Sequence, residues 1–263
     1  MSNTTVGMRA QDNTERRKFE GEVRRIVEAG NQAGVTLRLL GSLAFQSHCA
    51  RFGYLQAAMG RAYTDIDLAG YSRQARPIAE LMGGLGYIED REVFVVTEGG
   101  RAIFENAGSR LHVDVFYGKL DFCHVIRWDG RLEADSPTIP LAELLLEKMQ
   151  IVKINEKDVI DTIMLLLEHP LGAGDAETIN LSRIARLCAE EWGLWRTTTM
   201  NLDKVGQLVQ GYPQLDGEQK GRVTDQVRVA LAGINAEPKP LAWRLRARVG
   251  DRVKWYKDVD EVK

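Results

Sequence analysis

The sequence predicts an α+β fold, in which a mixed sheet with flanking helices is followed by a C-terminal helical domain. Short apolar segments of strand-like character are confined to the first half of the chain. In the second half, apolar residues recur at helical spacing almost throughout. Between the halves, Pro137 and Pro140 argue against a continuous helix. We therefore predict an α/β domain over residues 1–139 and a helical domain over residues 140–263.

The elements of the first half are predicted in chain order from the spacing of their apolar residues. Residues 14–29 show helical spacing, and the segment VTLRLL at 35–40 indicates a strand that ends at the Gly-Ser pair 41–42. Helices are predicted at 43–49 and 77–85, and strands at 66–69, 93–97, 101–105, 110–117, 125–128 and 131–133. The sequences EGG at 98–100 and DG at 129–130 are typical of hairpin turns between the strands on either side.

The second half is predicted as a series of helices. Their expected ranges are 140–153, 156–168, 177–192, 198–211, 217–235 and 239–261. Pro140 suits the first turn of the first helix, because its missing N–H would have no helical partner there. Asn155 and Asp158 have the three-residue spacing of a capping box at the start of the second helix.

Composition excludes several classes of protein. The chain is 44% apolar and 27% charged with a net charge of −2, so a nucleic-acid or membrane partner would need a local patch. Three cysteines without a CxxC pair argue against a disulfide framework or a zinc ribbon and favour a reducing compartment. No apolar run is long enough to span a bilayer, and the N-terminus lacks the apolar core of a signal peptide. We expect a cytoplasmic protein with no membrane partner.

Three aspartates on predicted strands form the main candidate site. Asp65 and Asp67 are two residues apart, so on a strand both side chains point to the same face. Asp114, in the sequence HVDVF, adds a third carboxylate from another apolar strand. Oxygen ligands of this kind suit Mg²⁺ or Mn²⁺, and three carboxylates can hold two ions roughly 3.5–4 Å apart. Alternatively, each aspartate is a solvated residue at a strand end.

Gly41 and Ser42 form a second candidate site, because they follow an apolar strand and open a predicted helix. Glycine lets the backbone approach a phosphate closely, and a helix N-terminus supplies N–H donors and a favourable dipole. The alternative is an ordinary strand-to-helix turn in which Ser42 is the N-cap residue.

Together, these features resemble the nucleotidyltransferase superfamily of DNA polymerase beta. The resemblance implies that an acceptor hydroxyl attacks the α-phosphorus of a bound nucleoside triphosphate (NTP) and releases pyrophosphate. It also implies that Asp65 and Asp67 hold the nucleotide-side metal, and that Asp114 completes a second metal site. The sequence departs from the family in one respect: 22 residues separate Ser42 from Asp65, where about a dozen are usual. Either a longer helix and loop or a divergent site would account for the difference.

Arg61 and Thr64 precede the motif Asp65-Ile66-Asp67, and Lys148 and Asp161 lie on the first two helices predicted after the sheet. In these features the chain is most similar to the AbiEii-like abortive-infection branch of the superfamily, and it also resembles uncharacterised nucleotidyltransferase-like bacterial proteins. The similarity implies nucleotide-binding roles for Arg61, Thr64 and Asp161, and a catalytic contact of Lys148 with the triphosphate. The branch includes toxins of toxin–antitoxin systems, so an antitoxin partner is implied too. The alternative for Lys148 and Asp161 is an exposed ion pair worth less than about 1 kcal/mol.

The C-terminal helix predicted at 239–261 is basic. Between Lys239 and Lys257 there are seven basic residues and one acidic residue. Arg244, Arg248 and Arg252 recur every four residues and would form one stripe, with Trp243, Trp255 and Tyr256 interleaved. Such a stripe can bind tRNA or another RNA through phosphate contacts and stacking. The alternative is a solvated helix face whose aromatic residues pack inward.

From these observations we expect a metal-dependent nucleotidyltransferase that uses Mg²⁺ or Mn²⁺ and an NTP, with tRNA as a candidate acceptor. Two alternatives stay open. One is a nucleotidyltransferase that modifies a small molecule of the antibiotic type. The other is a catalytically inactive module that binds nucleotides or proteins.

Overall fold

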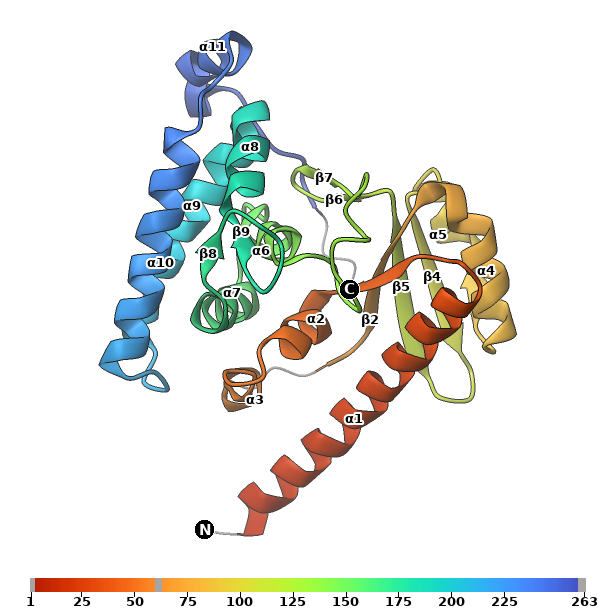
Figure 1. Cartoon of the computed structure of the whole chain (residues 1–263). Coiled ribbons are helices and arrows are strands. Elements are labelled where there is room, and N and C mark those ends of the chain that lie inside the picture. The colour runs from red at the N-terminus through yellow and green to blue at the C-terminus, as the bar shows by residue number, and fades with distance from the viewer. Residues whose placement is uncertain (1–2, 60–62, 260–263) are drawn as a thin grey trace. The chain divides into compact units, whose positions relative to one another are not determined.

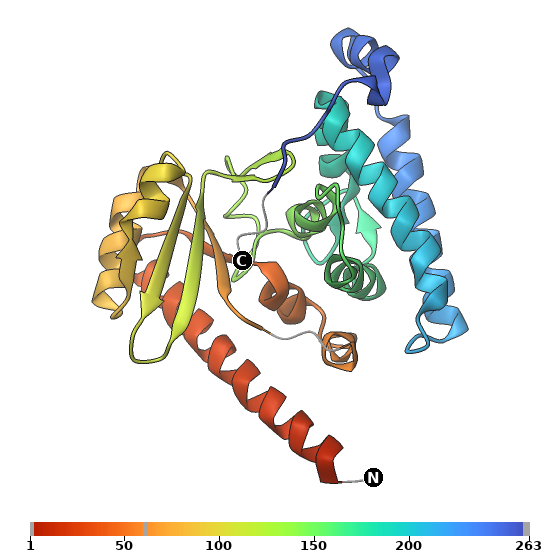
Figure 2. The same ribbon diagram turned by 180° about the vertical axis from the view of Figure 1, so that it is seen from behind.

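The computed structural model describes residues 3–59 and 63–259, with side chains in the first helix described from Arg16 onward (Figures 1 and 2). The chain forms two compact units, each assembled from more than one stretch of sequence. The first contains the chain up to Ser47, Gln56–Lys119 and Arg127–Ile139. The second contains His48–Leu55, Leu120–Ile126 and the chain from Pro140 onward. One boundary therefore falls between residues 139 and 140, while two short stretches of the first half belong to the second unit.

The first unit is built on a five-stranded mixed sheet (Figure 1). Its strands are β1 (Leu37–Leu40), β2 (Ile66–Gly70), β3 (Ile88–Asp90), β4 (Arg101–Asn106) and β5 (Leu111–Tyr117). They lie in the order β1-β2-β5-β4-β3. The β2–β5 pair is parallel, and the other neighbours are antiparallel. The predicted α+β class and the mixed sheet are thus confirmed.

One face of this sheet is apolar and packs on helices α1 (Asn3–Gln32) and α4 (Ala75–Gly84). Gly70 lies at the contact with α4, where an added Cβ would come within 2.8 Å of Ile78 Cδ1. Because strand side chains alternate, Leu68 points to the same face as Gly70, and the residue between them, like Asp67, points to the other. The opposite face is therefore the one that carries the polar residues of β2 and β5.

Shorter elements complete the first half of the chain. Helix α2 (Gly41–His48) follows β1 without an intervening loop, and α3 (Tyr54–Ala58) is a single short turn of helix. A 3₁₀ turn, η1 (Ser72–Gln74), leads into α4. The predicted helix at 43–49 is confirmed, with its start two residues earlier.

The predicted strand at 93–97 is wrong, because this segment lies in helix α5 (Arg91–Val96). Asp90 caps the helix by accepting hydrogen bonds from two backbone N–H groups of its first turn, at 3.0 and 3.4 Å. This cap outweighs the strand preference of the valines that follow. The hairpin predicted through 98–100 is wrong as well, since β4 pairs with β3 instead.

The second predicted hairpin is also wrong, because its first strand pairs with a different strand. Strand β7 (Val125–Arg127) pairs with the preceding β6 (Lys119–Asp121), and residues 131–133 form turns. Gly130 has φ +63°, so the predicted turn at 129–130 does form. The predicted turn at 129–130 is therefore confirmed, but the predicted pairing of residues 125–128 with 131–133 is wrong.

The second unit is mainly helical. Its helices are α6 (Leu141–Met149), α7 (Glu156–Glu168), α8 (Leu181–Glu190), α9 (Trp192–Leu208), α10 (Gly217–Ala236) and α11 (Leu241–Val249), with 3₁₀ turns η2 (Val209–Gly211) and η3 (Gly250–Arg252). Helix α7 has the predicted range, and its capping box is confirmed. The Asn155 side chain accepts from the Asp158 N–H at 3.0 Å, and Asp158 accepts from the Asn155 N–H at 3.3 Å.

Several helix boundaries differ from the prediction, and α6 ends at Met149, four residues before the predicted end. Helix α8 starts later, because strand β9 (Ile179–Asn180) pairs with β8 (Leu171–Gly172) just before it. Helix α9 starts earlier, at Trp192. Helix α11 ends at Val249, because Gly250 adopts φ +60°. Among the described helices, none combines the length and apolar character that crossing a bilayer requires.

Candidate metal centre

The fold brings the three predicted aspartates together on two adjacent strands. Asp67 of β2 and Asp114 of β5 are directly opposite each other in the parallel register. Asp65 comes two residues before Asp67 and therefore projects from the same face. One carboxylate oxygen from each residue lies within 4.8 Å of the other two. Asp114 is buried, whereas Asp65 and Asp67 are partly exposed, so the group opens to solvent on one side.

This arrangement fits a hard divalent cation. The donors are carboxylate oxygens alone, which suit Mg²⁺ and Mn²⁺. Oxygens on opposite sides of a Mg²⁺ ion are about 4 Å apart, given a metal–oxygen distance of about 2.0–2.1 Å. The observed limit of 4.8 Å is slightly wider than that spacing. The three aspartates are therefore candidate ligands of one ion.

Gly41 lies directly against this carboxylate group. It has φ +70°, a conformation that glycine adopts without the steric penalty of a side chain. A Cβ at this position would lie 2.2 Å from Oδ2 of Asp67. The predicted phosphate-binding turn, Gly41-Ser42, is therefore next to the predicted metal ligands. Ser42 is buried, and its carbonyl accepts a hydrogen bond from Gln56 Nε2 at 3.1 Å.

The residues that lead into β2 support the same site. The Thr64 hydroxyl donates to Asp65 Oδ1 at 2.9 Å and so orients that carboxylate. The Tyr63 hydroxyl donates to Gln56 Oε1 at 2.7 Å, which ties this segment to α3. Arg61, predicted as a nucleotide contact, lies outside the described residues.

The long interval between Ser42 and Asp65 has a structural explanation. It contains most of α2, the whole of α3, and the stretch His48–Leu55, which belongs to the second unit. The described part of this interval therefore forms an excursion between β1 and β2.

Arg101 is a charged partner of Asp114 that the sequence did not reveal. Its Nη2 lies 2.6 Å from Asp114 Oδ2 and its Nε lies 3.3 Å from Oδ1, so the guanidinium engages both carboxylate oxygens. The same guanidinium is 5.4 Å from the ring centre of Phe116. In the β4–β5 register Arg101 is opposite Phe116, which makes it the diagonal neighbour of Asp114. Finding it from sequence would have required this register.

Lys148 and Asp161 belong to the second unit, in helices α6 and α7. The Lys148 Nζ lies 2.8 Å from Glu147, 3.7 Å from Asp161 and 3.8 Å from Asp158. Burial alone would lower the pKa of Lys148, but Glu147, Asp161 and Asp158 together outweigh it and raise that pKa above its ordinary value. Lys148 is only 8% exposed and Asp161 is fully buried, so the alternative of an exposed ion pair is wrong. Within this unit the carboxylates already compensate the lysine charge.

The histidines and cysteines lie outside the carboxylate group. His112 shares a face with Asp114, but its Nδ1 is 3.6 Å from Glu105 on the neighbouring strand. All three cysteines are buried free thiols. Burial raises the pKa of Cys188 to about 12 and also raises the pKa of Cys49, which suppresses the thiolate form that a nucleophile or metal ligand needs.

Searches among protein-family models, curated proteins and solved structures found no match for this chain. The functional argument therefore depends on the residues of the site.

Proposed function

We propose that this protein is a metal-dependent nucleotidyltransferase that resembles the DNA polymerase beta superfamily. It would move a nucleotide from an NTP to an acceptor hydroxyl and release pyrophosphate. One observation carries the proposal: Asp65, Asp67 and Asp114 have carboxylate oxygens within 4.8 Å of one another, and the Gly41-Ser42 turn lies against Asp67. Carboxylates suited to a metal ion and a helix N-terminus suited to phosphate are thus neighbours on one sheet face.

Each part of the site has a separate task in this proposal. Asp65 and Asp67 would hold the nucleotide-side Mg²⁺ or Mn²⁺, and Thr64 keeps the Asp65 carboxylate in place. Asp114 would complete a second ion site on the acceptor side. When bound, such ions neutralise phosphate charge and make an acceptor hydroxyl easier to deprotonate. Gly41 lets the start of α2 come close to the triphosphate, where backbone N–H groups of the first helical turn would donate to its oxygens.

Metal binding and catalysis are testable separately. Mn²⁺ binding is measured by calorimetry, and transfer is measured with labelled NTPs and pools of RNA or small-molecule acceptors. The wild-type protein should bind Mn²⁺ and label an acceptor. Asp67→Asn should weaken Mn²⁺ binding at least ten-fold and abolish labelling, because it removes an anionic ligand. Asp129→Asn is the matched control, since Asp129 is an exposed carboxylate of the same unit.

Two results would contradict this function. One is unchanged Mn²⁺ affinity in Asp67→Asn, which would mean that the aspartates are not metal ligands. The other is intact metal binding with no labelling for any NTP and acceptor pool.

The second candidate is a catalytically inactive binding module, and the Arg101–Asp114 pair favours it. A guanidinium on both oxygens of Asp114 compensates this carboxylate without a second metal ion. A module of this kind would bind an NTP equally well with Mg²⁺ or with EDTA, and Asp67→Asn would leave that affinity unchanged. Calorimetry with a non-hydrolysable NTP under both conditions separates the two candidates.

A further inference from the structure

The second unit contains an open hollow that the proposed chemistry does not use. It lies between the start of α9 and the end of α11 with η3, and its volume is about 670 Å³. Its polar and aromatic lining comes from Trp192, Trp195, Arg196, Arg248, Asp251 and Arg252. The hollow is thus an aromatic and basic groove within one unit of the chain.

The charge of the groove is positive. Arg196 and Asp251 neutralise each other through a two-pronged contact, with Nε–Oδ1 at 3.0 Å and Nη2–Oδ2 at 2.8 Å. Arg248 and Arg252 are exposed, and neither forms an ion pair with any residue in the described part of the chain. Two guanidinium groups are therefore available to an anionic ligand. Their arrangement differs from the predicted stripe, because α11 ends at Val249 and Arg252 belongs to η3.

The aromatic part of the groove is Trp195. Its indole is partly exposed, and its Nε1 is fixed by donation to Asn235 Oδ1 at 2.8 Å. Trp192 is buried, and the Arg246 guanidinium covers its ring at 4.3 Å. Trp243, predicted as part of the stripe, instead donates inward to the Cys188 carbonyl at 3.0 Å. Of these indoles, Trp195 is the one with exposed surface that also lines the groove.

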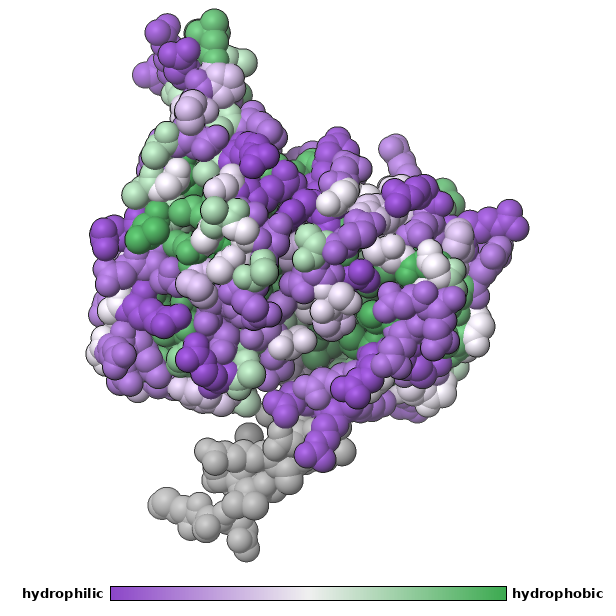
Figure 3. All heavy atoms as spheres, viewed as in Figure 1, coloured by the Kyte–Doolittle hydropathy of each residue, from purple (hydrophilic) through white to green (hydrophobic). Residues whose placement is uncertain are grey.

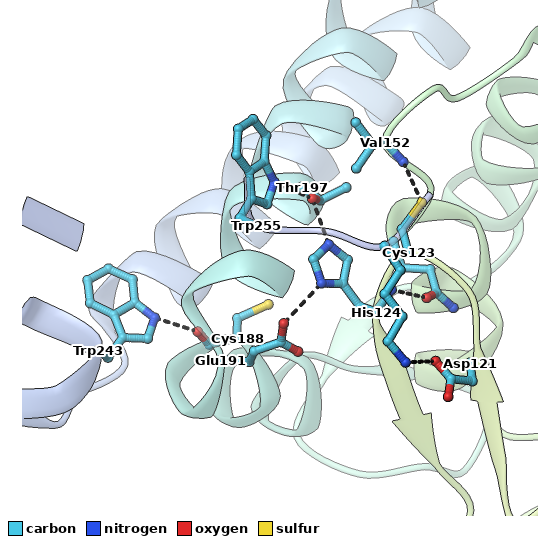
Figure 4. A network of polar contacts seen from close by, with 11 residues as sticks. Asp121, Cys123, His124, Val152, Cys188, Glu191, Thr197, Trp243 and Trp255 are labelled. Carbon is cyan, nitrogen blue, oxygen red and sulfur yellow. Dashed lines mark hydrogen bonds and ion pairs between the residues drawn. The ribbon is translucent and has the colours of Figure 1, made fainter. Parts of the chain in front are cut away.

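Hydrogen bonds from Arg246 and Trp255 fix the shape of the groove. Arg246 donates from Nη1 to the Gly250 carbonyl and from Nη2 to the Val253 carbonyl, both at 2.8 Å, which fixes η3 at the end of α11. Trp255 then donates to the Thr197 hydroxyl on α9 at 3.1 Å (Figure 4). Two residues further on, the Lys257 N–H donates to the Cys123 carbonyl at 3.1 Å. The strap formed by residues 253–258 therefore ties the groove to the body of the second unit.

His124 anchors this strap (Figure 4). Because the Thr197 hydroxyl accepts from Trp255, its own proton is free to be donated to His124 Nε2, which lies 2.8 Å away. His124 Nδ1 then carries the ring proton and donates it to Glu191 at 3.0 Å. Each of these hydrogen-bonding groups of Trp255, Thr197 and His124 has a partner, so ligand binding would not have to order this side of the groove.

We propose that this groove binds single-stranded nucleic acid, with phosphates at Arg248 and Arg252 and one base against Trp195. Guanidinium groups bind phosphate oxygens strongly, and the partly exposed indole of Trp195 offers its open surface to a base. Figure 3 shows hydrophilic and hydrophobic side chains side by side on α11. Binding does not depend on the metal centre, so it goes beyond the proposed function and can be tested without it.

The test uses the full chain and a fluorescently labelled single-stranded 12-mer, as RNA and as DNA, in EDTA. The double variant Arg248→Ala/Arg252→Ala should weaken binding at least ten-fold at low salt. It should also reduce the slope of log affinity against log salt by about 1.4, since each lost phosphate contact on a single strand contributes about 0.7. The matched control is Arg186→Ala/Arg222→Ala, which removes two exposed arginines from α8 and α10 and should change affinity less than two-fold.

A third variant isolates stacking. Trp195→Leu should weaken binding of the 12-mer several-fold while leaving binding of inorganic polyphosphate unchanged, because polyphosphate has no bases. Circular dichroism and the melting temperature show whether each variant is folded. The proposal is overturned if the wild-type protein does not bind the 12-mer, or if the groove and control double variants bind it equally. It is also overturned if polyphosphate or polyglutamate binds as tightly as the oligonucleotide and Trp195→Leu has no effect.

Discussion

At the scale of single residues, the contact between Gly41 and Asp67 links the turn before α2 to the carboxylate group. Gly41→Ala would place a Cβ 2.2 Å from Asp67 Oδ2, so the carboxylate has to move. We expect this variant to bind Mn²⁺ at least ten-fold more weakly, as measured by calorimetry. Gly34→Ala is the control, because Gly34 has nearly the same φ (+68°) but no atom within 4 Å of its added Cβ.

Both glycine variants should lose roughly 1–2 kcal/mol of folding stability from the strained backbone. Gly41→Ala should lose somewhat more, because its Cβ also displaces the Asp67 carboxylate, and it alone should lose metal affinity. Equal Mn²⁺ affinities in the two variants would show that moving the Asp67 carboxylate away from Gly41 does not affect the ion. Asp67 would then not be a metal ligand.

Arg101 gives a second prediction at this scale. Arg101→Gln removes a positive charge beside Asp114 and should therefore raise Mn²⁺ affinity several-fold. Without metal the same variant should be less stable by about 1–3 kcal/mol, because a buried carboxylate loses its partner. Saturating Mn²⁺ should recover most of this loss in a thermal unfolding experiment. Arg101→Lys, which keeps the charge but not the two-pronged contact, should have an intermediate effect.

A fall in Mn²⁺ affinity on Arg101→Gln would mean the reverse role, in which the arginine holds Asp114 in the geometry that the ion needs. The two signs of the affinity change thus distinguish a charge that competes with the metal from one that positions its ligand.

The carboxylate group was predictable from sequence because it follows from local rules. Strand alternation puts Asp65 and Asp67 on one face, and an apolar strand around Asp114 supplies the third oxygen donor. Arg101 could not be predicted in the same way. Its relation to Asp114 depends on the β4–β5 register, whereas the local sequence favoured pairing of residues 101–105 with 93–97.

At the scale of elements, a prediction was wrong where the strand preference of a segment was outweighed by a capping residue just before it. Valine-rich residues 93–97 favour a strand, but Asp90 caps a helix there. The range of α7 was predicted correctly because capping at Asn155 and apolar spacing indicate the same helix. Agreement between such signals, rather than the strength of one, separates the reliable elements from the others.

The end of α2 gives a prediction about pH. His48 packs edge-on against His169, with ring centres 5.6 Å apart, and burial, followed by the charge of His169, lowers the pKa of His48 to about 4. Above pH 6.5 the residue is neutral in both the folded and the unfolded chain. Between pH 6.5 and 4 the unfolded chain takes up a proton and the folded chain does not. Stability should therefore fall as pH falls through this window, by at most roughly 3 kcal/mol.

Chemical denaturation from pH 7 to pH 4 measures this effect in the wild-type protein and in His48→Gln. The variant lacks the titrating ring and should lose less stability over the window. Parallel pH profiles for the wild-type protein and the variant would show that His48 does not contribute to acid sensitivity.

At the scale of the whole molecule, the chain passes between its two units five times. The sequence indicated the passage near Pro140, where prolines and a change in periodicity coincide. It did not indicate that His48–Leu55 and Leu120–Ile126 belong to the second unit. Those stretches belong to the second unit because they contact residues far away in the sequence, such as Arg51 with Glu168 at 3.0 Å. Contacts of this kind cannot be inferred from local composition.

The assignment of Leu120–Ile126 predicts that cutting at the composition break removes part of the helical core. Leu120 and Ile126 are fully buried and His124 is 3% exposed, with its ring tied to Glu191 and Thr197. A fragment of residues 120–263 should therefore be more stable than one of residues 127–263, although both keep the segment before Pro140. Burying two large aliphatic side chains alone contributes roughly 3–6 kcal/mol, so the shorter fragment should melt at a much lower denaturant concentration. Equal midpoints would mean that the helices are complete without this hairpin, and that the two-unit division follows the proline break after all.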